Sequence, residues 1–164
     1  MGYVDLRLFC PVQVAGPTAV AAMNCLAGAR ALIFDLRKNG GGEDGMVRLL
    51  AGYLFDEATE LCTIHHRGER GLEQSRSLDY VPGPRLAHLP AYVLTSVRTF
   101  SAAEDFAYNL QQRGRVTVVG EQTRGGGHTV EVVPLAEFGL ELYMPEGEAI
   151  NPISKRSWDK YFPG

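Results

Sequence analysis

The hydrophobic positions of this chain fall into two kinds of pattern that alternate along the sequence. Nearly continuous apolar runs occur at three places, residues 31–36, 91–94 and 116–120. Such runs are typical of strands buried on both faces, as in a parallel sheet covered by helices. Apolar residues at helical spacing predict three helices, at residues 18–29, 44–55 and 101–113. The alternation predicts an α/β fold with a mostly parallel central sheet, built as a single domain over residues 1–164.

Weaker patterns predict the remaining elements. Looser alternation indicates further strands at residues 3–9, 60–67, 77–81, 130–134 and 140–144, and residues 145–157 look irregular. Pro17 is expected in the first turn of the first helix. In the third helix one face has core spacing, and the opposite, polar face carries Ser101, Glu104, Asp105 and Tyr108.

Composition and charge narrow the classes of function. The chain has 164 residues, 45% hydrophobic, with a net charge of −3, which gives no electrostatic reason to expect a nucleic-acid partner. No apolar run approaches the roughly 20 residues that span a bilayer, so no membrane-spanning segment is expected. Cys10, Cys25 and Cys62 are far apart and lack metal-ligand spacing. We therefore expect no metal and no cofactor.

The most informative residue is Ser101, which follows a buried strand and starts a helix. Ser101 and Glu104 have the spacing of a capping box, so helix capping alone can explain the serine. A serine here also lies at the carboxyl edge of the sheet, where α/β folds place their ligand-binding and active sites. It is close to the free N–H groups at the start of the helix. Both interpretations, cap and nucleophile, are open at this point.

Two glycine-rich loops follow buried strands and are expected at the same edge. Residues 40–42 and 125–127 are each three consecutive glycines, and the second run is followed by His128. Backbone N–H groups in such loops can cradle an oxyanion, although a flexible connection explains them equally well. His128 could act as general base to Ser101. Acids that could orient it are Glu104, Glu121, Glu131 and Glu148, and the sequence does not choose among them.

Four segments together resemble the tail-specific, or C-terminal processing, serine peptidases. Their strand and glycine loop are matched by Ala-Leu-Ile-Phe-Asp-Leu-Arg-Lys-Asn-Gly-Gly-Gly at residues 31–42. Their nucleophile segment is matched by Leu-Thr-Ser-Val-Arg-Thr-Phe-Ser-Ala-Ala-Glu-Asp-Phe-Ala-Tyr at residues 94–108. Residues 118–128 resemble the next strand and loop, and residues 149–153 a segment near the end of the core. The branch that resembles this chain most is that of the interphotoreceptor retinoid-binding protein modules and the tricorn core.

The resemblance implies a fold, a chemistry and a set of site residues. The fold would be a ClpP/crotonase-like core of ββα units. The chemistry would be a serine-type peptidase attacking a peptide carbonyl of a polypeptide substrate through Ser101, with the backbone N–H groups of Gly41 and Ala102 as oxyanion hole and His128 as base. The alternative is a non-catalytic module of the same fold that binds a hydrophobic ligand. A periplasmic or secreted location is implied, although no signal peptide is visible here.

This chain departs from the family pattern at the residue that activates the serine. In the processing peptidases a lysine in the glycine loop does so, and its position here is occupied by Gly126. In the tricorn-like branch a histidine upstream of the core takes this role. The tail at residues 157–164 also departs from the usual glycine-rich continuation. We therefore expect that the chain is a fragment or relies on an additional domain or a homo-oligomer.

Overall fold

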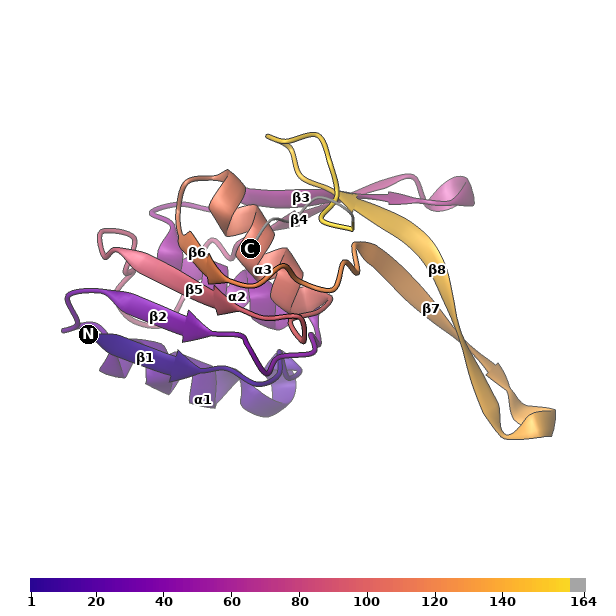
Figure 1. The fold of residues 1–164 in the computed structure, drawn as a ribbon, viewed down its shortest axis with the longest axis horizontal. Helices are drawn as coiled ribbons and strands as arrows, with labels where there is room; N and C mark the ends of the chain where they lie inside the picture. The colour runs from indigo at the N-terminus through magenta and orange to yellow at the C-terminus, as the bar shows by residue number, and fades with distance from the viewer. Residues whose placement is uncertain (160–164) are drawn as a thin grey trace.

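The computed structural model describes residues 1–159 and contains two four-stranded sheets (Figure 1). The first sheet is entirely parallel, which confirms the predicted central sheet. Its strands follow the order β1 (Gly2–Asp5), β2 (Leu32–Asp35), β5 (Ala91–Thr95) and β6 (Thr117–Gly120). The last five residues of the tail, 160–164, lie outside the described residues.

Three helices pack together beside this sheet, α1 (Val12–Cys25), α2 (Asp44–Leu54) and α3 (Ala102–Gln112). Helix α2 contacts both α1 and α3, and α3 also contacts β6 of the first sheet and β3 (Glu60–His66) of the second. The centre of the core is aromatic, because the Phe106 ring lies 5.7 Å from the ring of Phe9 and 5.3 Å from that of Phe34.

The polar face of α3 is buried inside the protein. Glu104 is 0% exposed, Asp105 8% and Tyr108 3%. The reason is that α3 lies between the two sheets, so both of its faces are covered. The polar residues of this face are therefore internal.

The second sheet is antiparallel and larger than the sequence pattern indicated. Its strands follow the order β4 (Leu72–Arg76), β3, β8 (Leu140–Ile150) and β7 (His128–Leu135). The predicted strand at residues 77–81 is wrong, because the chain turns earlier, through the 3-10 turn Gly68–Arg70 and Gly71 at φ 70°. Residues 145–150, expected to be irregular, continue β8, and residues 147–150 pair with β3.

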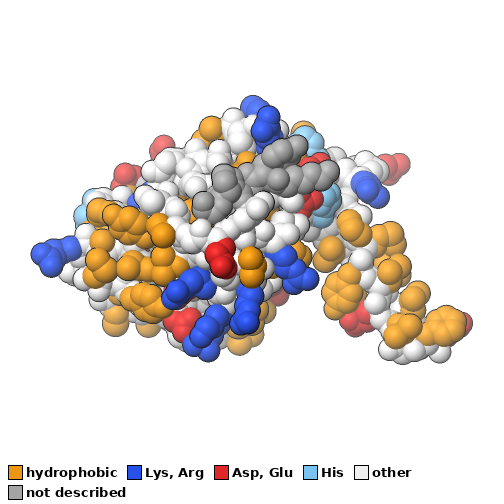
Figure 2. Space-filling model, viewed as in Figure 1, with side chains coloured by type: hydrophobic (Ala, Val, Ile, Leu, Met, Phe, Trp, Pro, Cys, Tyr) orange, Lys and Arg blue, Asp and Glu red, His pale blue; other side chains and the backbone are white. Residues whose placement is uncertain are grey.

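The hairpin β7–β8 extends from the body as an arm (Figure 1). Figure 2 shows hydrophobic side chains along it, and the largest exposed ones are Val130, Val132, Phe138, Leu140, Leu142, Tyr143 and Met144. A two-stranded ribbon has only marginal stability in water by itself. The stability of the arm therefore depends on its base, where β8 joins β3.

Helix α1 begins six residues before the predicted start, so Pro17 lies inside it rather than in its first turn. The N–H groups of Val14 and Ala15 already donate to the carbonyl of Pro11, at 2.9 and 3.0 Å. Proline removes one helical hydrogen bond, the one to the carbonyl of Gln13. Gln13 and Pro17 are both exposed, so water can donate a hydrogen bond to the Gln13 carbonyl. Within residues 1–159, no helix has the length and apolar character needed to cross a membrane.

Candidate active site

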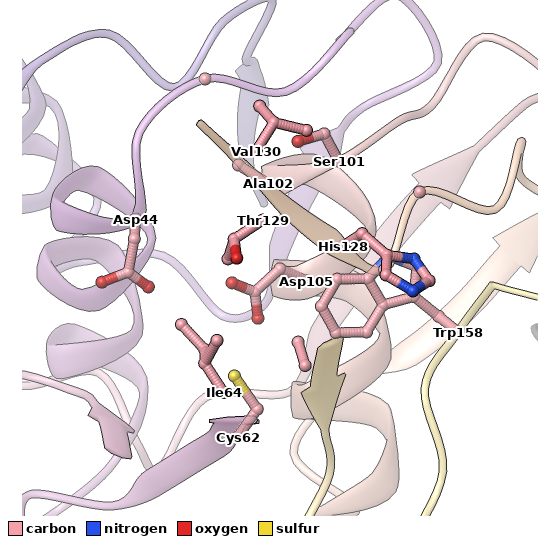
Figure 3. A pocket seen from close by; sticks show the side chains of 14 residues that line it. Asp44, Cys62, Ile64, Ser101, Ala102, Asp105, His128, Thr129, Val130 and Trp158 are labelled. Atoms are coloured by element: carbon pink, nitrogen blue, oxygen red, sulfur yellow. The ribbon is translucent and has the colours of Figure 1, made fainter. Parts of the chain in front are cut away.

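Ser101 occupies a strained turn between β5 and α3. Its backbone has φ 55° and ψ −124°, a region that non-glycine residues rarely adopt and that costs about 1–3 kcal/mol. Its carbonyl accepts the N–H groups of Glu104 and Asp105 at 2.8 and 2.9 Å, so the start of the helix is held by backbone. The side chain lines a cavity (Figure 3). A sharp strand-to-helix turn of this kind presents a serine hydroxyl to a site.

The first glycine loop lies directly against this serine. A Cβ on Gly41, which has φ 108°, would lie 2.8 Å from the Cβ of Ser101 and 3.2 Å from the backbone nitrogen of Ala102. The loop is fixed by the buried Asn39, whose side-chain amide donates to the carbonyl of Leu6 and whose Oδ1 accepts the N–H of Gly41, each at 2.8 Å. Only glycine permits this approach of one backbone to the other.

Glu104 joins the turn at Ser101 to the second glycine loop. Its Oε2 accepts the backbone N–H of Ser101 at 2.7 Å and that of Gly126 at 2.9 Å, and its Oε1 accepts the N–H of Gly125 at 2.6 Å. A buried carboxylate is tolerated where several N–H groups donate to it. The capping-box spacing predicted the first of these contacts. The other two, to residues 21 and 22 positions later, have no local signal in the sequence.

His128 is paired with an acid that sequence reasoning missed. Its Nδ1 lies 2.8 Å from Oδ2 of Asp159, and Oδ1 of the same carboxylate accepts the N–H of Gly127. A carboxylate at Nδ1 favours the tautomer in which Nε2 is free to accept a proton. Of the four acids considered from the sequence, Glu104 is buried and accepts the three backbone N–H groups just described. Within the described part of the chain, none of the four makes an ion pair with His128.

The tail that carries Asp159 is positioned by the buried Asn151. Its Oδ1 accepts the N–H groups of Ile153 and Ser154 at 2.8 and 3.0 Å, and its Nδ2 donates to Oδ1 of Asn109 on α3 at 2.8 Å. These contacts explain the segment at residues 149–153 that was singled out from the sequence. They turn the chain after β8 back toward the glycine loop.

The cavity beside Ser101 has a volume of about 270 Å³ and is lined by both glycine loops, His128 and the start of α3. Figure 3 shows Asp105 near its centre, between Asp44 and Trp158. Burial, and then the charge of Asp44, raises the pKa of Asp105 to about 7. Burial also raises the pKa of Asp44, although a hydrogen bond from Ser75 opposes this.

Of the residues predicted for the site, Ser101, Ala102 and His128 all line this cavity, and Gly41 lies against the first two. No hydrogen bond joins the hydroxyl of Ser101 to the His128 ring in the described structure. At the lysine position of the processing peptidases, a Cβ on Gly126 would collide with the ring of Phe100. A side chain at this position would therefore require the Phe100 ring to move.

Comparison with known proteins identifies the family. The model of peptidase family S41 matches residues 1–161. The chain belongs to peptidase family S41. A carboxyl-terminal-processing protease of Picosynechococcus sp. is 33% identical over 129 residues, which are 77% of this chain and 29% of that protein. The chain thus spans less than a third of this S41 relative.

Solved structures show that the S41 fold is shared. The photosystem II D1 C-terminal processing protease matches 98% of this chain and 40% of its own, with a TM-score of 0.77 and 24% identity. The putative S41 protease from Bacteroides fragilis matches 99% of this chain and 44% of its own, with a TM-score of 0.78 and 21% identity. The fold class predicted from the resemblance is confirmed.

Proposed function

We propose that this chain carries the active site of a serine peptidase, with Ser101 as the nucleophile. The observation that carries the proposal is the strained backbone of Ser101, at a strand-to-helix turn that faces a cavity with the Gly41 backbone against it. An ordinary helix cap does not require a strained backbone. Strain of this kind is typically retained at functional sites. Membership of peptidase family S41 supports the same assignment.

In the proposed reaction, Oγ of Ser101 attacks the peptide carbonyl carbon, and its proton passes to Nε2 of His128. The imidazolium then gives that proton to the leaving amine as the peptide bond breaks and the acyl-enzyme forms. Water releases the acyl group by the reverse sequence of proton transfers. Asp159 stabilises the charged imidazole through Nδ1. The Ser101 hydroxyl and the His128 ring, which are not hydrogen-bonded here, would have to come within hydrogen-bond distance when substrate binds, as nucleophile and base commonly do.

The oxyanion would be held by backbone N–H groups beside Ser101. Ala102 is the first residue of α3, so its N–H has no partner within the helix. The N–H of Gly41 donates to Asn39, and would have to exchange that acceptor for the oxyanion. The next amide, of Gly42, donates to none of the described residues, and Gly42 lines the cavity. We therefore assign the oxyanion hole to Ala102 together with residues 41–42.

The substrate would be a polypeptide, as the names of the relatives imply. The exposed apolar side chains of the β7–β8 arm support the expectation that a further domain or a second copy of the chain completes the protein. The alternative function, binding of a hydrophobic ligand, would use the same cavity. The carboxylates of Asp44 and Asp105 in its wall disfavour that alternative, because an apolar ligand would remove water from them.

A fluorophosphonate probe tests the proposal, because it labels activated serines. We expect the purified chain to be labelled, and Ser101→Ala to abolish the labelling. Absence of labelling, together with saturable binding of a hydrophobic fluorophore, would instead support the ligand-binding module.

A further inference from the structure

The cavity beside Ser101 contains two carboxylates that the proposed chemistry does not use. Asp105 lies on α3 one turn after Ser101, and Asp44 is the first residue of α2. Oδ1 of Asp105 accepts the side-chain amide of Asn109, whereas Oδ2 has no donor among the described residues. No lysine or arginine of residues 1–159 forms an ion pair with Asp105.

Asp44 is only partly compensated. Its Oδ1 accepts the hydroxyl of Ser75 at 2.8 Å, and Nε of Arg48 lies 3.9 Å from its Oδ2. Arg48 does not line the cavity, and solvent screens this pair because the side chains of Arg48 and Asp44 are 41% and 45% exposed. Within residues 1–159, this wall of the cavity therefore carries two carboxylates and no lysine or arginine.

A second observation also indicates a ligand in this cavity. Trp158 lines it and is 4% exposed, yet its indole N–H has no acceptor among the described residues. A buried donor without an acceptor is costly, so an atom of a bound molecule is the expected partner. The indole ring is also the aromatic surface that attracts cations most strongly.

We propose that this cavity binds the side chain of the substrate residue whose carbonyl Ser101 attacks, and that it selects lysine or arginine there. The inference rests on the proposed peptidase function and names its substrate class. Asp105 is the counter-ion of the bound cation, and Asp44 adds to the negative potential. The Trp158 ring covers the aliphatic stem, and its N–H donates to the peptide.

The dimensions of the helix agree with this assignment. Asp105 is four positions after Ser101, which corresponds to about 6 Å along the axis of α3. The four-carbon stem of lysine covers such a span and delivers a compact positive charge at its end. Because residues four apart lie on the same helix face, a side chain that enters beside Ser101 runs toward Asp105.

The charge of the occupant follows from the cost of desolvation. An apolar side chain would expel water from the two carboxylates and give no compensating interaction. A basic side chain removes the same water but pairs with Asp105, and a charge-assisted hydrogen bond is stronger than a neutral one. The basic side chain is therefore favoured over an uncharged one of equal length.

Fluorogenic peptides that differ only at the residue before the scissile bond test the proposal. Lysine, arginine and norleucine are compared, because norleucine resembles lysine without its ammonium group. We expect kcat/KM of the full chain to be about 10- to 100-fold higher for lysine than for norleucine. Asp105→Asn should reduce this ratio to about one, whereas the matched variant of an exposed acid, Asp79→Asn, should keep it.

Binding provides a readout that does not need turnover. Calorimetry with Ser101→Ala protein should show tighter binding of the lysine peptide than of the norleucine peptide, and Asp105→Asn in the same background should remove the difference. Equal or weaker binding of the lysine peptide would overturn the inference, whether or not the enzyme is active. Absence of hydrolysis and of fluorophosphonate labelling, with the binding preference intact, would instead refute the peptidase function alone.

Discussion

Replacing Asp105 by asparagine should stabilise the protein, and by an amount that depends on pH. The pKa of Asp105 is raised from 3.8 to about 7, so between these values the folded state binds more protons than the unfolded state. The free energy of unfolding therefore falls as pH rises through this window. Asparagine keeps the acceptor for Asn109 but carries no charge, so the variant lacks this loss.

The size of the effect follows from the same two pKa values. One pH unit corresponds to about 1.4 kcal/mol, so the difference between 3.8 and about 7 gives roughly 4 kcal/mol at pH 8. This is an upper bound, because the cavity admits water to the carboxylate. Below pH 4 the wild type and the variant should have nearly equal free energies of unfolding.

Urea denaturation from pH 4 to pH 8 measures this difference, with circular dichroism and the fluorescence of Trp158, the single tryptophan, as probes. Asp44, Cys62 and His128 line the same cavity from α2, β3 and β7 and are present in both proteins. The charge of Asp44 acts on Asp105, so its contribution is part of the measured difference. Asp79→Asn, an exposed acid, serves as the control. A difference that is constant with pH, or a wild type that is more stable at pH 8, would refute the reasoning.

Three other substitutions test the geometry of the site. Gly41→Ala should abolish fluorophosphonate labelling, because its methyl group would lie 2.8 Å from the Cβ of Ser101. The control Gly40→Ala, whose methyl group would have open space around it, should label normally. Equal labelling of the two variants would contradict this placement of the loop. Glu104→Gln should lower the free energy of unfolding by about 2–4 kcal/mol in urea denaturation, since one backbone N–H would then face an NH2 group. An unchanged free energy of unfolding would show that Glu104 does not accept these backbone N–H groups. His128→Gln should lower kcat at least about 100-fold with little change in KM, and a rate close to wild type would exclude this imidazole as base.

The sequence predicted the elements whose patterns are local. The strands of the parallel sheet and the helix after Ser101 were placed correctly, because continuous apolar runs and a capping sequence are short-range signals. The burial expected for residues 116–120 was wrong, because β6 is an edge strand and three of its four residues are exposed. The strand at residues 145–150 was missed, since Pro145 and Gly147 interrupt its alternation while its pairing with β3 comes from a distant segment.

The site itself was predicted only in part, for the same physical reason. Ser101 and His128 were proposed from a helix start and a glycine loop, and Ala102 from the family resemblance; the structure brings all three to one cavity. Asp159 was not predicted, because it is 31 residues from His128 in the sequence and no spacing rule links the two positions. The second function of Glu104, holding the glycine loop, likewise depends on a fold that no local pattern encodes.

The β7–β8 pairing has an irregularity between Thr129 and Val130, which divides the hairpin into a base and an arm. Above it, His128 lies opposite Glu148 at the cavity; below it, Val130 to Leu135 pair with residues of the arm alone. Residues inserted at the tip, around Gly139, therefore lengthen the arm without moving the imidazole. The tip is a place where an affinity tag or a fluorescent label can be introduced while the active site stays as it is.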